Sequence, residues 1–272
     1  MEIKKDDILK IIKPRRREAH KGDFGHALFV GGSYGKMGAA VLASRACLRT
    51  GVGLLTAHIP ACGNLVLQIA VPEAMCLMDR EEGFISEFPA DLERYSAIGV
   101  GPGLGRLPET AVAFFNFLKR AEKPLVLDAD ALNILSENPE WLAFVPKNSI
   151  ITPHSKEFER ISGVAKNRAE QIEKAKAFSL KYGLIVVLKG AGTFIACPDG
   201  KEYVNTTGNP FMATAGSGDV LCGMILSLLA QGYSPESSAV AGVFLHGLAG
   251  DRAAEKRSPI TAGDIVEAIS LQ

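Results

Sequence analysis

Short apolar runs alternate with longer amphipathic stretches along almost the whole chain. Runs such as His26–Val30 (HALFV), Val52–Ile59 (VGLLTAHI) and Ile185–Lys189 (IVVLK) are mostly apolar and adjoin glycine. A short, nearly uninterrupted apolar run is typical of a strand that is covered on both faces. The stretches between them carry charge on one side, as expected of covering helices. This alternation predicts an α/β fold with three layers, in which a central, mostly parallel sheet lies between helices.

The expected elements follow one another as strand, loop and helix. The unit at 26–59 indicates parallel strands joined by a right-handed crossover. Thr193–Asn205 (TFIACPDGKEYVN) predicts a small β-hairpin around an Asp-Gly turn. No linker rich in proline, serine or charge divides the chain, so we expect a single domain over residues 1–272. Further strands are expected at 73–78, 96–100, within 124–135 (ending in Asp128 and Asp130) and at 149–152, and helices at 39–51, 64–70, 108–121, 168–181 and after Thr261.

Composition narrows the class of protein. The 272 residues are 47% hydrophobic and 22% charged, with 28 glycines, which indicates a large core with many tight turns. Thirty basic residues balance thirty acidic ones, so no overall field attracts nucleic acid or an anionic membrane. The five cysteines form no C-x-x-C pair, which argues against disulfide and zinc frameworks. With no signal-peptide pattern at MEIKKDD and no apolar run of membrane-spanning length, we expect a cytoplasmic protein.

The stretch Asn205–Gly223 (NTTGNPFMATAGSGDVLCG) is the strongest chemical feature of the chain. Glycines crowd up to Asp219, after which the sequence becomes apolar, as at a loop that enters a buried helix. The first N–H groups of a helix lack partners and carry partial positive charge, so this junction suits phosphate. Asp219 has two interpretations: a helix cap, or a base that takes a proton from a hydroxyl during phosphoryl transfer.

Other candidate residues follow expected strands. Glycine loops at 31–38 and Gly101–Gly105 (GPGLG) would meet at one sheet edge, where ligands of α/β proteins bind. The 31–38 loop fits neither G-x-G-x-x-G nor the Walker pattern, which disfavours a Rossmann dehydrogenase or a P-loop enzyme. Asp128 and Asp130 could act on metal-bound water, on substrate hydroxyls or on a neighbouring helix N-terminus. His154 could touch substrate or be structural, and Lys189 could contact phosphate or belong to the hairpin.

Two further groups have a structural interpretation beside the functional one. Arg15, Arg16 and Arg17 either form a solvated or subunit-contacting surface or bind phosphate. His246 falls within an apolar helical pattern, AVAGVFLHGLAG, which favours a packed core histidine.

Taken together, these motifs resemble the ribokinase-like superfamily, and more closely the ADP/ATP-dependent NAD(P)H-hydrate dehydratase family. The motifs that carry the resemblance cover nearly the whole chain in the family's order: HKGDFGHALFVGGSYGKMGAA, VGPGLG, PLVLDADALN, ITPHSKEF, VVLKGAGT and NTTGNPFMATAGSGDVLCG. The epimerase domain that precedes this module in many bacterial members is not in this sequence. Two positions depart from the usual pattern: Ser155-Lys156 replaces Pro-Gly after the histidine, and Phe211 replaces glycine. Both are expected to alter the shape of their loops, and the first bears on substrate placement more than on chemistry.

The resemblance implies repair of hydrated NADH or NADPH at the expense of ADP or ATP, with Mg²⁺ bridging the nucleotide phosphates. It implies that Asp219 is the catalytic base and that the backbone of Ala215, Gly216, Ser217 and Gly218 forms an anion hole. Lys189, Gly190, Ala191, Gly192, Thr193 and Gly218 would hold the nucleotide, and Ala39, Ala40, Gly103, His154, Asn209 and Asp219 the hydrate. The family commonly forms homotetramers. The alternative activity is a kinase of the same fold that acts on a small alcohol such as hydroxymethylpyrimidine or hydroxyethylthiazole. A third class, a nucleotide-binding sensor without turnover, stays open.

Overall fold

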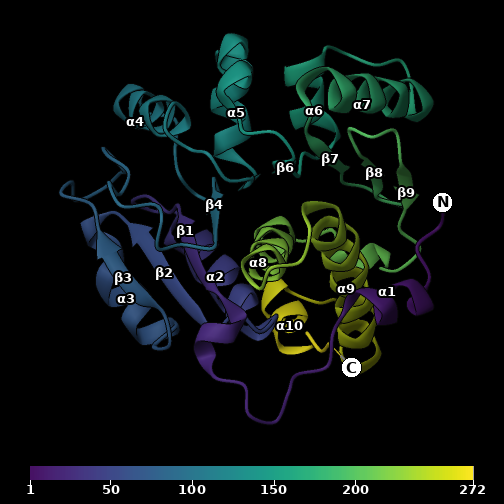
Figure 1. Ribbon diagram of the computed structural model, residues 1–272, viewed down its shortest axis with the longest axis horizontal. Coiled ribbons are helices and arrows are strands. Elements are labelled where there is room, and N and C mark those ends of the chain that lie inside the picture. Colours follow the sequence, from purple (N-terminus) through teal and green to yellow (C-terminus); the bar gives the residue numbers. More distant parts are fainter. Residues whose placement is uncertain (272) are drawn as a thin grey trace.

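A computed structural model describes residues 1–271, which form a sheet of nine strands in the order β3-β2-β1-β4-β5-β6-β7-β8-β9 (Figure 1). The strands from β3 to β7 run parallel, and β8 and β9 turn back as an antiparallel hairpin. The parallel strands are β1 (His26–Val30), β2 (Leu54–Ile59), β3 (Met75–Met78), β4 (Ala97–Val100), β5 (Leu125–Leu127), β6 (Ile150–Ile151) and β7 (Ile185–Leu188), and the hairpin strands are β8 (Phe194–Ala196) and β9 (Glu202–Val204).

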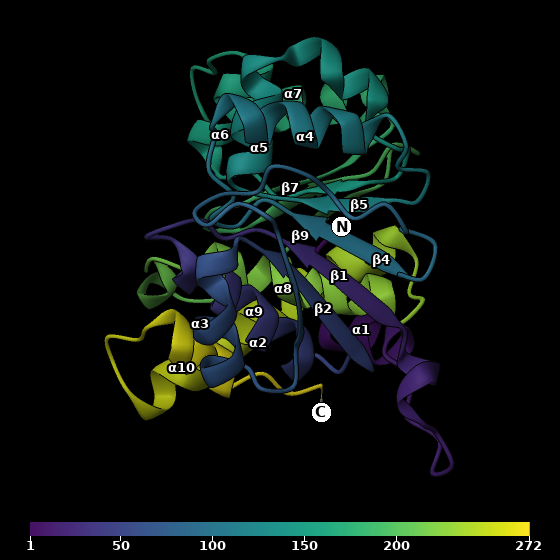
Figure 2. The ribbon, with the colours of Figure 1, turned by 90° about the vertical axis from the view of Figure 1, so that its left-hand side faces the viewer.

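Helices cover both faces of the sheet (Figure 2). The repeated strand–loop–helix order explains why, since each crossover between parallel strands places its helix on a face. One layer contains α4 (Pro108–Leu118), α5 (Asp130–Glu137), α6 (Ser155–Ser162) and α7 (Arg168–Tyr182). The other contains α2 (Met37–Arg49), α3 (Asn64–Ala70), α8 (Ser217–Ala230), α9 (Pro235–Lys256) and α10 (Ala262–Glu267), with α1 (Lys5–Ile11) packed on α9.

The helix α8 lies at the centre of its layer. All its residues from Val220 to Ala230 are buried, and it packs on α2, α9 and the central strands. Gly223 permits the closest of these approaches, because a Cβ at this position would lie 2.1 Å from the carbonyl oxygen of Ala43 in α2. The N-terminus of α8 is therefore held at a fixed place beside the carboxyl ends of β4 and β5.

The predicted three-layer α/β architecture with its β-hairpin is confirmed. One boundary was wrong: the strand expected to end in Asp128 and Asp130 ends at Leu127, and Asp130 is the first residue of α5. Asp128 follows the strand directly. The strand predicted from Val52 begins only at Leu54, since Gly53 lies against the backbone of Lys21.

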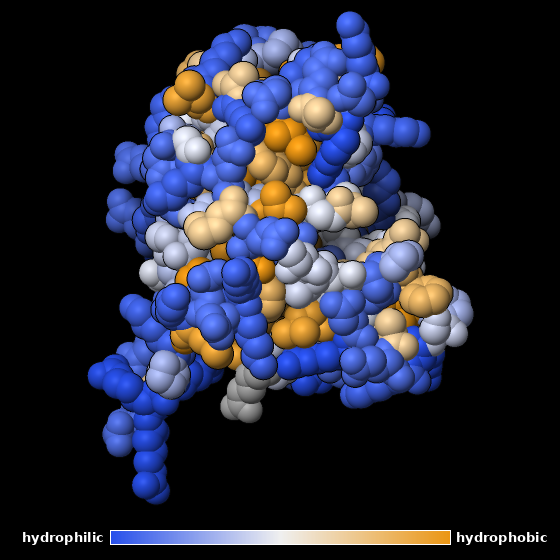
Figure 3. Space-filling model, turned by 90° about the vertical axis from the view of Figure 1, so that its right-hand side faces the viewer, coloured by the Kyte–Doolittle hydropathy of each residue, from blue (hydrophilic) through white to orange (hydrophobic). Residues whose placement is uncertain are grey.

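The segment between α1 and β1 extends away from the body of the molecule (Figure 2) and is hydrophilic (Figure 3). Within it, Arg15 Nη2 donates a hydrogen bond to Gly51 O, and Arg15 Cζ lies 3.7 Å from the centroid of the Phe24 ring. Arg16 Nη2 lies 4.0 Å from Asp23 Oδ2. Arg15 thus fastens the segment to the body. Among the residues described, no helix has the length and apolarity needed to cross a membrane.

Candidate functional site

The carboxyl ends of the central strands bring the predicted glycine loops together. Gly32 N–H, after β1, donates to Pro102 O (2.9 Å), and Ser33 Oγ donates to Gly103 O (2.7 Å), after β4. Asp130 joins the same group from α5, because its Oδ2 accepts from Gly105 N–H at 2.9 Å and lies 3.3 Å from Lys36 Nζ. Asp130 therefore fixes two loops relative to a third strand end.

The residues expected to line the substrate pocket in this region pack closely. A Cβ at Gly103 would lie 3.1 Å from Ala39 Cβ and 2.7 Å from Lys36 O, so the two loops touch. Gly103 has a φ of 67°, a conformation that a larger residue rarely adopts. Ala39 is partly exposed, whereas Ala40 is fully buried under Gly32. Of the two alanines, Ala39 is the one that reaches the surface.

The loop Ala215–Gly218 opens α8 with a row of backbone donors. Gly216, with φ 87°, is the N-cap and directs the chain into the helix. Among residues 1–271, the N–H groups of Ala215, Gly216, Gly218 and Asp219 find no backbone or side-chain acceptor, and Ser217 N–H has only a long contact of 3.4 Å with Thr214 O. These unpaired N–H groups, at the positive end of the helix dipole, suit a phosphoryl group.

Asp219, the third residue of α8, does not cap the helix. The cap is Gly216 without a side-chain hydrogen bond, and the Asp219 carboxylate has no hydrogen-bond partner within the described chain. Burial, followed by repulsion from Asp128, raises the pKa of Asp219 to about 7, although Lys189 opposes this shift. The carboxyl group can therefore accept a proton at neutral pH.

Lys189 forms the second electrostatic element of the site. Its Nζ lies 2.8 Å from Asp128 Oδ1 and 4.0 Å from Glu157 Oε2, and its side chain is 19% exposed. Burial alone would lower the pKa of Lys189, but Asp128 and Glu157 outweigh it and raise the pKa. The ammonium group also lies beneath the first turn of α8, since a Cβ at Gly218 would be 3.1 Å from it.

His154 and the turn after β7 lie next to each other. His154 pairs with Lys189 in an isolated bridge, and Lys189 N–H donates to Pro153 O at 2.9 Å. His154 Nδ1 accepts from Lys156 N–H (3.2 Å) and caps α6, which leaves Nε2 to carry the proton on a half-exposed ring. The cap uses the backbone N–H groups of Lys156 and Glu157, so Lys156 takes part in it through its backbone alone.

The exposed turn Gly190–Thr193 is closed by a hydrogen bond from Thr193 Oγ1 to Gly190 O at 3.1 Å. Ala191 and Gly192 are exposed at its tip. Arg168 supports the turn from α7 by donating to Leu188 O at 3.1 Å, and burial lowers its pKa. Sequence reasoning missed Arg168, because a basic residue at a helix start resembles ordinary surface charge.

The helix α9 contacts the loop around the anion site through Asp251 and His246, among other residues. Asp251 accepts from Gly208 N–H and from Asn209 Nδ2, both at 2.9 Å. His246 Nε2 lies 3.4 Å from Ser217 Oγ, and burial lowers the pKa of His246 to about 4, so the ring is neutral at physiological pH. The pattern favoured a packed core histidine, but His246 is only partly buried and lies against the anion loop. Asp251 was not predicted, since nothing near it in sequence suggests a site.

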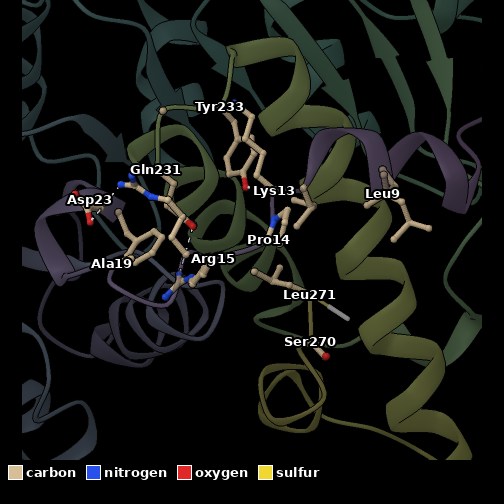
Figure 4. A pocket seen from close by; sticks show the side chains of 15 residues that line it. Leu9, Lys13, Pro14, Arg15, Ala19, Asp23, Gln231, Tyr233, Ser270 and Leu271 are labelled. Carbon is tan, nitrogen blue, oxygen red and sulfur yellow. Dashed lines mark hydrogen bonds and ion pairs between the residues drawn. The ribbon is translucent and has the colours of Figure 1, made fainter.

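A cavity of about 960 Å³ lies elsewhere, between α1, the segment that follows it and the C-terminal residues (Figure 4). Its lining includes Lys13, Arg15, Tyr233 and Leu271, and Lys13 N–H donates to Tyr233 Oη. Arg15 and Arg16, for which phosphate binding was one of two interpretations, line this cavity, but none of the residues expected to hold the nucleotide or the hydrate does. The chemistry of the chain is concentrated at the carboxyl edge of the sheet instead.

A row of free backbone donors followed by a carboxylate with a pKa near neutrality is suited to moving a phosphoryl group onto a hydroxyl. On a mostly parallel sheet between two helical layers, this arrangement defines the ribokinase-like class. A profile of the NAD(P)H-hydrate dehydratase family matches residues 27–271. The chain belongs to the NAD(P)H-hydrate dehydratase family.

Individual relatives agree with this assignment. The chain is 42% identical over 265 residues to a bifunctional NAD(P)H-hydrate repair enzyme of Moorella thermoacetica, a match that covers 93% of this chain and 50% of the relative. It is 40% identical over 269 residues to the ADP-dependent (S)-NAD(P)H-hydrate dehydratase of Neisseria meningitidis, covering 95% and 88%. The chain spans about half the length of the bifunctional relatives that it matches.

Solved structures show the same fold. The ADP/ATP-dependent NAD(P)H-hydrate dehydratase of Bacillus subtilis, co-crystallized with ATP/Mg²⁺, superposes with a TM-score of 0.85 at 30% identity and covers 97% of this chain and 94% of its own. A hydroxyethylthiazole kinase of Pyrococcus horikoshii superposes with a TM-score of 0.62 at 12% identity, covering 89% and 87%. The second match reflects the fold alone.

Proposed function

We propose that this protein dehydrates hydrated NADH or NADPH back to the intact cofactor, with ADP or ATP as phosphoryl donor. The observation that carries this proposal is Asp219, which has no hydrogen-bond partner within residues 1–271, has a pKa of about 7 and stands beside free N–H groups at the start of α8. Membership of the family indicates that the hydroxyl accepting the phosphoryl group is that of the hydrated nicotinamide ring. The relative from Neisseria is named for ADP, and the structure from Bacillus was grown with ATP and magnesium.

The reaction has two stages that balance. The hydroxyl oxygen of the hydrated ring attacks the terminal phosphorus, its proton passes to Asp219, and the bond to the leaving nucleotide oxygen breaks. The ring carbon–oxygen bond then breaks with its electron pair leaving on phosphate, and the adjacent ring carbon gives up a proton to that phosphate as the double bond returns. Asp219 releases the proton it accepted to solvent. The net products are NAD(P)H, inorganic phosphate and ADP from ATP, or AMP from ADP.

The backbone N–H groups of Ala215, Gly216 and Gly218 would bind the oxygens of the phosphoryl group in transfer. They lie in fixed positions before substrate arrives, which is the condition for strong stabilisation of developing charge. Lys189 would add a positive charge below this loop, and the turn Gly190–Thr193 would hold the remainder of the nucleotide. Ala39, Gly103, His154 and Asn209 would contact the hydrate, with the buried Ala40 packed under Gly32.

The residues present fit a magnesium ion that arrives with the nucleotide. Within residues 1–271 there is no cluster of three or more His, Cys, Asp or Glu side chains arranged to hold a metal. Asp128 Oδ1 is taken by Lys189, which leaves Oδ2 facing the first turn of α8. Magnesium keeps most of its waters and needs few protein ligands, so Asp128 and the phosphates would suffice. The ion would neutralise phosphate charge.

The test is an assay of the purified chain with hydrated NADH, Mg²⁺ and either ADP or ATP. We expect recovery of the absorbance of the reduced nicotinamide with one phosphate released per cofactor, dependent on one or both nucleotides. A protein that binds nucleotide but returns no NADH would contradict the proposal, and stable phosphorylation of hydroxyethylthiazole or hydroxymethylpyrimidine would establish the kinase alternative.

Assembly and location are part of the same proposal. We expect a homotetramer in the cytoplasm, in line with the family resemblance. Light scattering on the eluted protein measures the number of copies, and fractionation of the source cells locates it. A monomer would contradict the expected assembly without affecting the reaction.

A further inference from the structure

One face of α9 carries the loop that leads into α8. Thr207 Oγ1 donates to Phe244 O at 2.8 Å, and Gly247 lies so close that a Cβ there would be 2.2 Å from Thr207 Oγ1. Gly250, three residues further on, would place a Cβ 2.2 Å from Met212 Sδ. The two glycines therefore let the loop rest directly on the helix backbone.

Asp251 is the charged member of this face. Its Oδ2 accepts from Gly208 N–H and its Oδ1 from Asn209 Nδ2, each at 2.9 Å. Each carboxylate oxygen thus has its own donor on consecutive residues of the loop. A carboxylate that accepts two such bonds holds its donors more firmly than a neutral acceptor does.

These bonds decide how Asn209 is oriented. Its Nδ2 faces Asp251, and its Oδ1 accepts from Phe211 N–H at 3.0 Å, so the amide cannot be turned over without losing both bonds. One N–H of Nδ2 and one lone pair of Oδ1 are left for a ligand. The loop itself gives little other support to this orientation, since Gly208, Pro210 and Phe211 are all exposed.

We infer that Asp251 is a positioning residue, which orients the free N–H and lone pair of Asn209 toward the hydroxyl-bearing acceptor. This inference rests on the proposed function, in which Asn209 contacts the hydrate. Asp251 itself touches no substrate. Its effect passes through Asn209 and through the Gly208 backbone, and it sets the shape of a surface loop more than the stability of the core.

The test compares Asp251→Ala with Glu255→Ala, a matched control that removes an exposed carboxylate one turn further along α9. In Asp251→Ala we expect faster amide hydrogen exchange in residues 206–212 and a kcat/KM for the hydrate that is about ten- to a hundredfold lower. The KM for the nucleotide and the Tm should match those of the control. Asp251→Asn keeps one acceptor oxygen, so its exchange rate and its kcat/KM for the hydrate should lie between those of wild type and Asp251→Ala.

A double-mutant cycle separates positioning from general damage. If Asp251 acts through Asn209, adding Asp251→Ala to Asn209→Ala should cost little more than Asn209→Ala alone. Additive losses, or unchanged exchange and unchanged kcat/KM in Asp251→Ala, would overturn the inference. If wild-type protein returned no NADH, the proposed function would fail, and exchange in 206–212 would still decide whether Asp251 holds the loop.

Discussion

Asp219 is partly buried, and its carboxylate accepts no hydrogen bond within residues 1–271. Its neighbours within the site are acidic as well as basic, and burial and repulsion together raise its pKa to about 7. A general base is most effective when its pKa lies near the pH at which it works. The pKa of this carboxylate meets that condition, so the site needs no histidine as its base. Asp219→Asn should therefore lower turnover by about a thousandfold or more while nucleotide affinity stays within about twofold. Single-turnover kinetics and calorimetric titration of ADP measure the two quantities, with Asp6→Asn on the exposed face of α1 as the control.

The same pKa predicts the pH profile. Below pH 7 the protonated fraction of Asp219 grows, so kcat/KM should fall about tenfold per pH unit on the acidic side and level off above pH 7 to 8. His246, with a pKa of about 4, stays neutral across this range and should contribute no limb. A profile that is flat between pH 5 and pH 8 would show that another group accepts the proton.

A raised pKa also has a cost in stability, with a definite sign. The folded state binds the Asp219 proton more tightly than the unfolded chain, so the favourable contribution is complete below about pH 4 and is lost as pH rises through 7. Asp219→Asn removes the buried charge. Its free energy of unfolding should exceed that of wild type by about 4 kcal/mol at pH 8 and by much less at pH 4. Urea unfolding at the two pH values measures this difference, and an equal offset at both would contradict it.

At the scale of elements, the crossing of α2 and α8 depends on Gly223. A Cβ there would lie 2.1 Å from the Ala43 carbonyl oxygen, and backbone cannot move aside as a flexible side chain can. Gly223→Ala should therefore lower the free energy of unfolding by about 1 to 3 kcal/mol or more. Gly38→Ala, also helical, is the control, because its Cβ would meet nothing within 4 Å. If the two variants had equal free energies of unfolding, α2 and α8 would be able to move apart at this crossing without loss of stability.

The sequence predicted the elements with clear periodicity and missed what depends on distant pairing. His26–Val30 was predicted with its boundaries, since both its faces are covered and its ends are marked by glycine. The short strand Leu125–Leu127 carries too little pattern to show where it stops, so Asp130 was misplaced. Lys189 and Asp128 are 61 residues apart in sequence, and only the folded sheet brings them together. Asp251 lies on an ordinary helical stretch, and its role comes entirely from the loop placed against it.

At the scale of the whole molecule, the two helical layers share one sheet. Alternate residues of a strand such as β1 face opposite layers, since Ala27 and Phe29 belong to one core and Leu28 and Val30 to the other. Neither core can be lost while the other keeps a complete sheet. We therefore expect one cooperative unfolding transition, in accordance with a single domain. Differential scanning calorimetry checks this, and a van't Hoff enthalpy well below the calorimetric one would indicate separate units.

The buried helix α8 and the exposed loop before it have different parts in the site. The helix holds the carboxylate, and the loop would contact the acceptor. Asp219 belongs to helix α8, which is enclosed by α2, α9 and the sheet. Residues 206–212 instead lie on the surface and are held by a few polar bonds. Substitutions in residues 206–212 therefore leave the packing of helix α8 unchanged. An engineer who wanted this scaffold to accept a different alcohol would redesign residues 206–212 and keep the helix as it is.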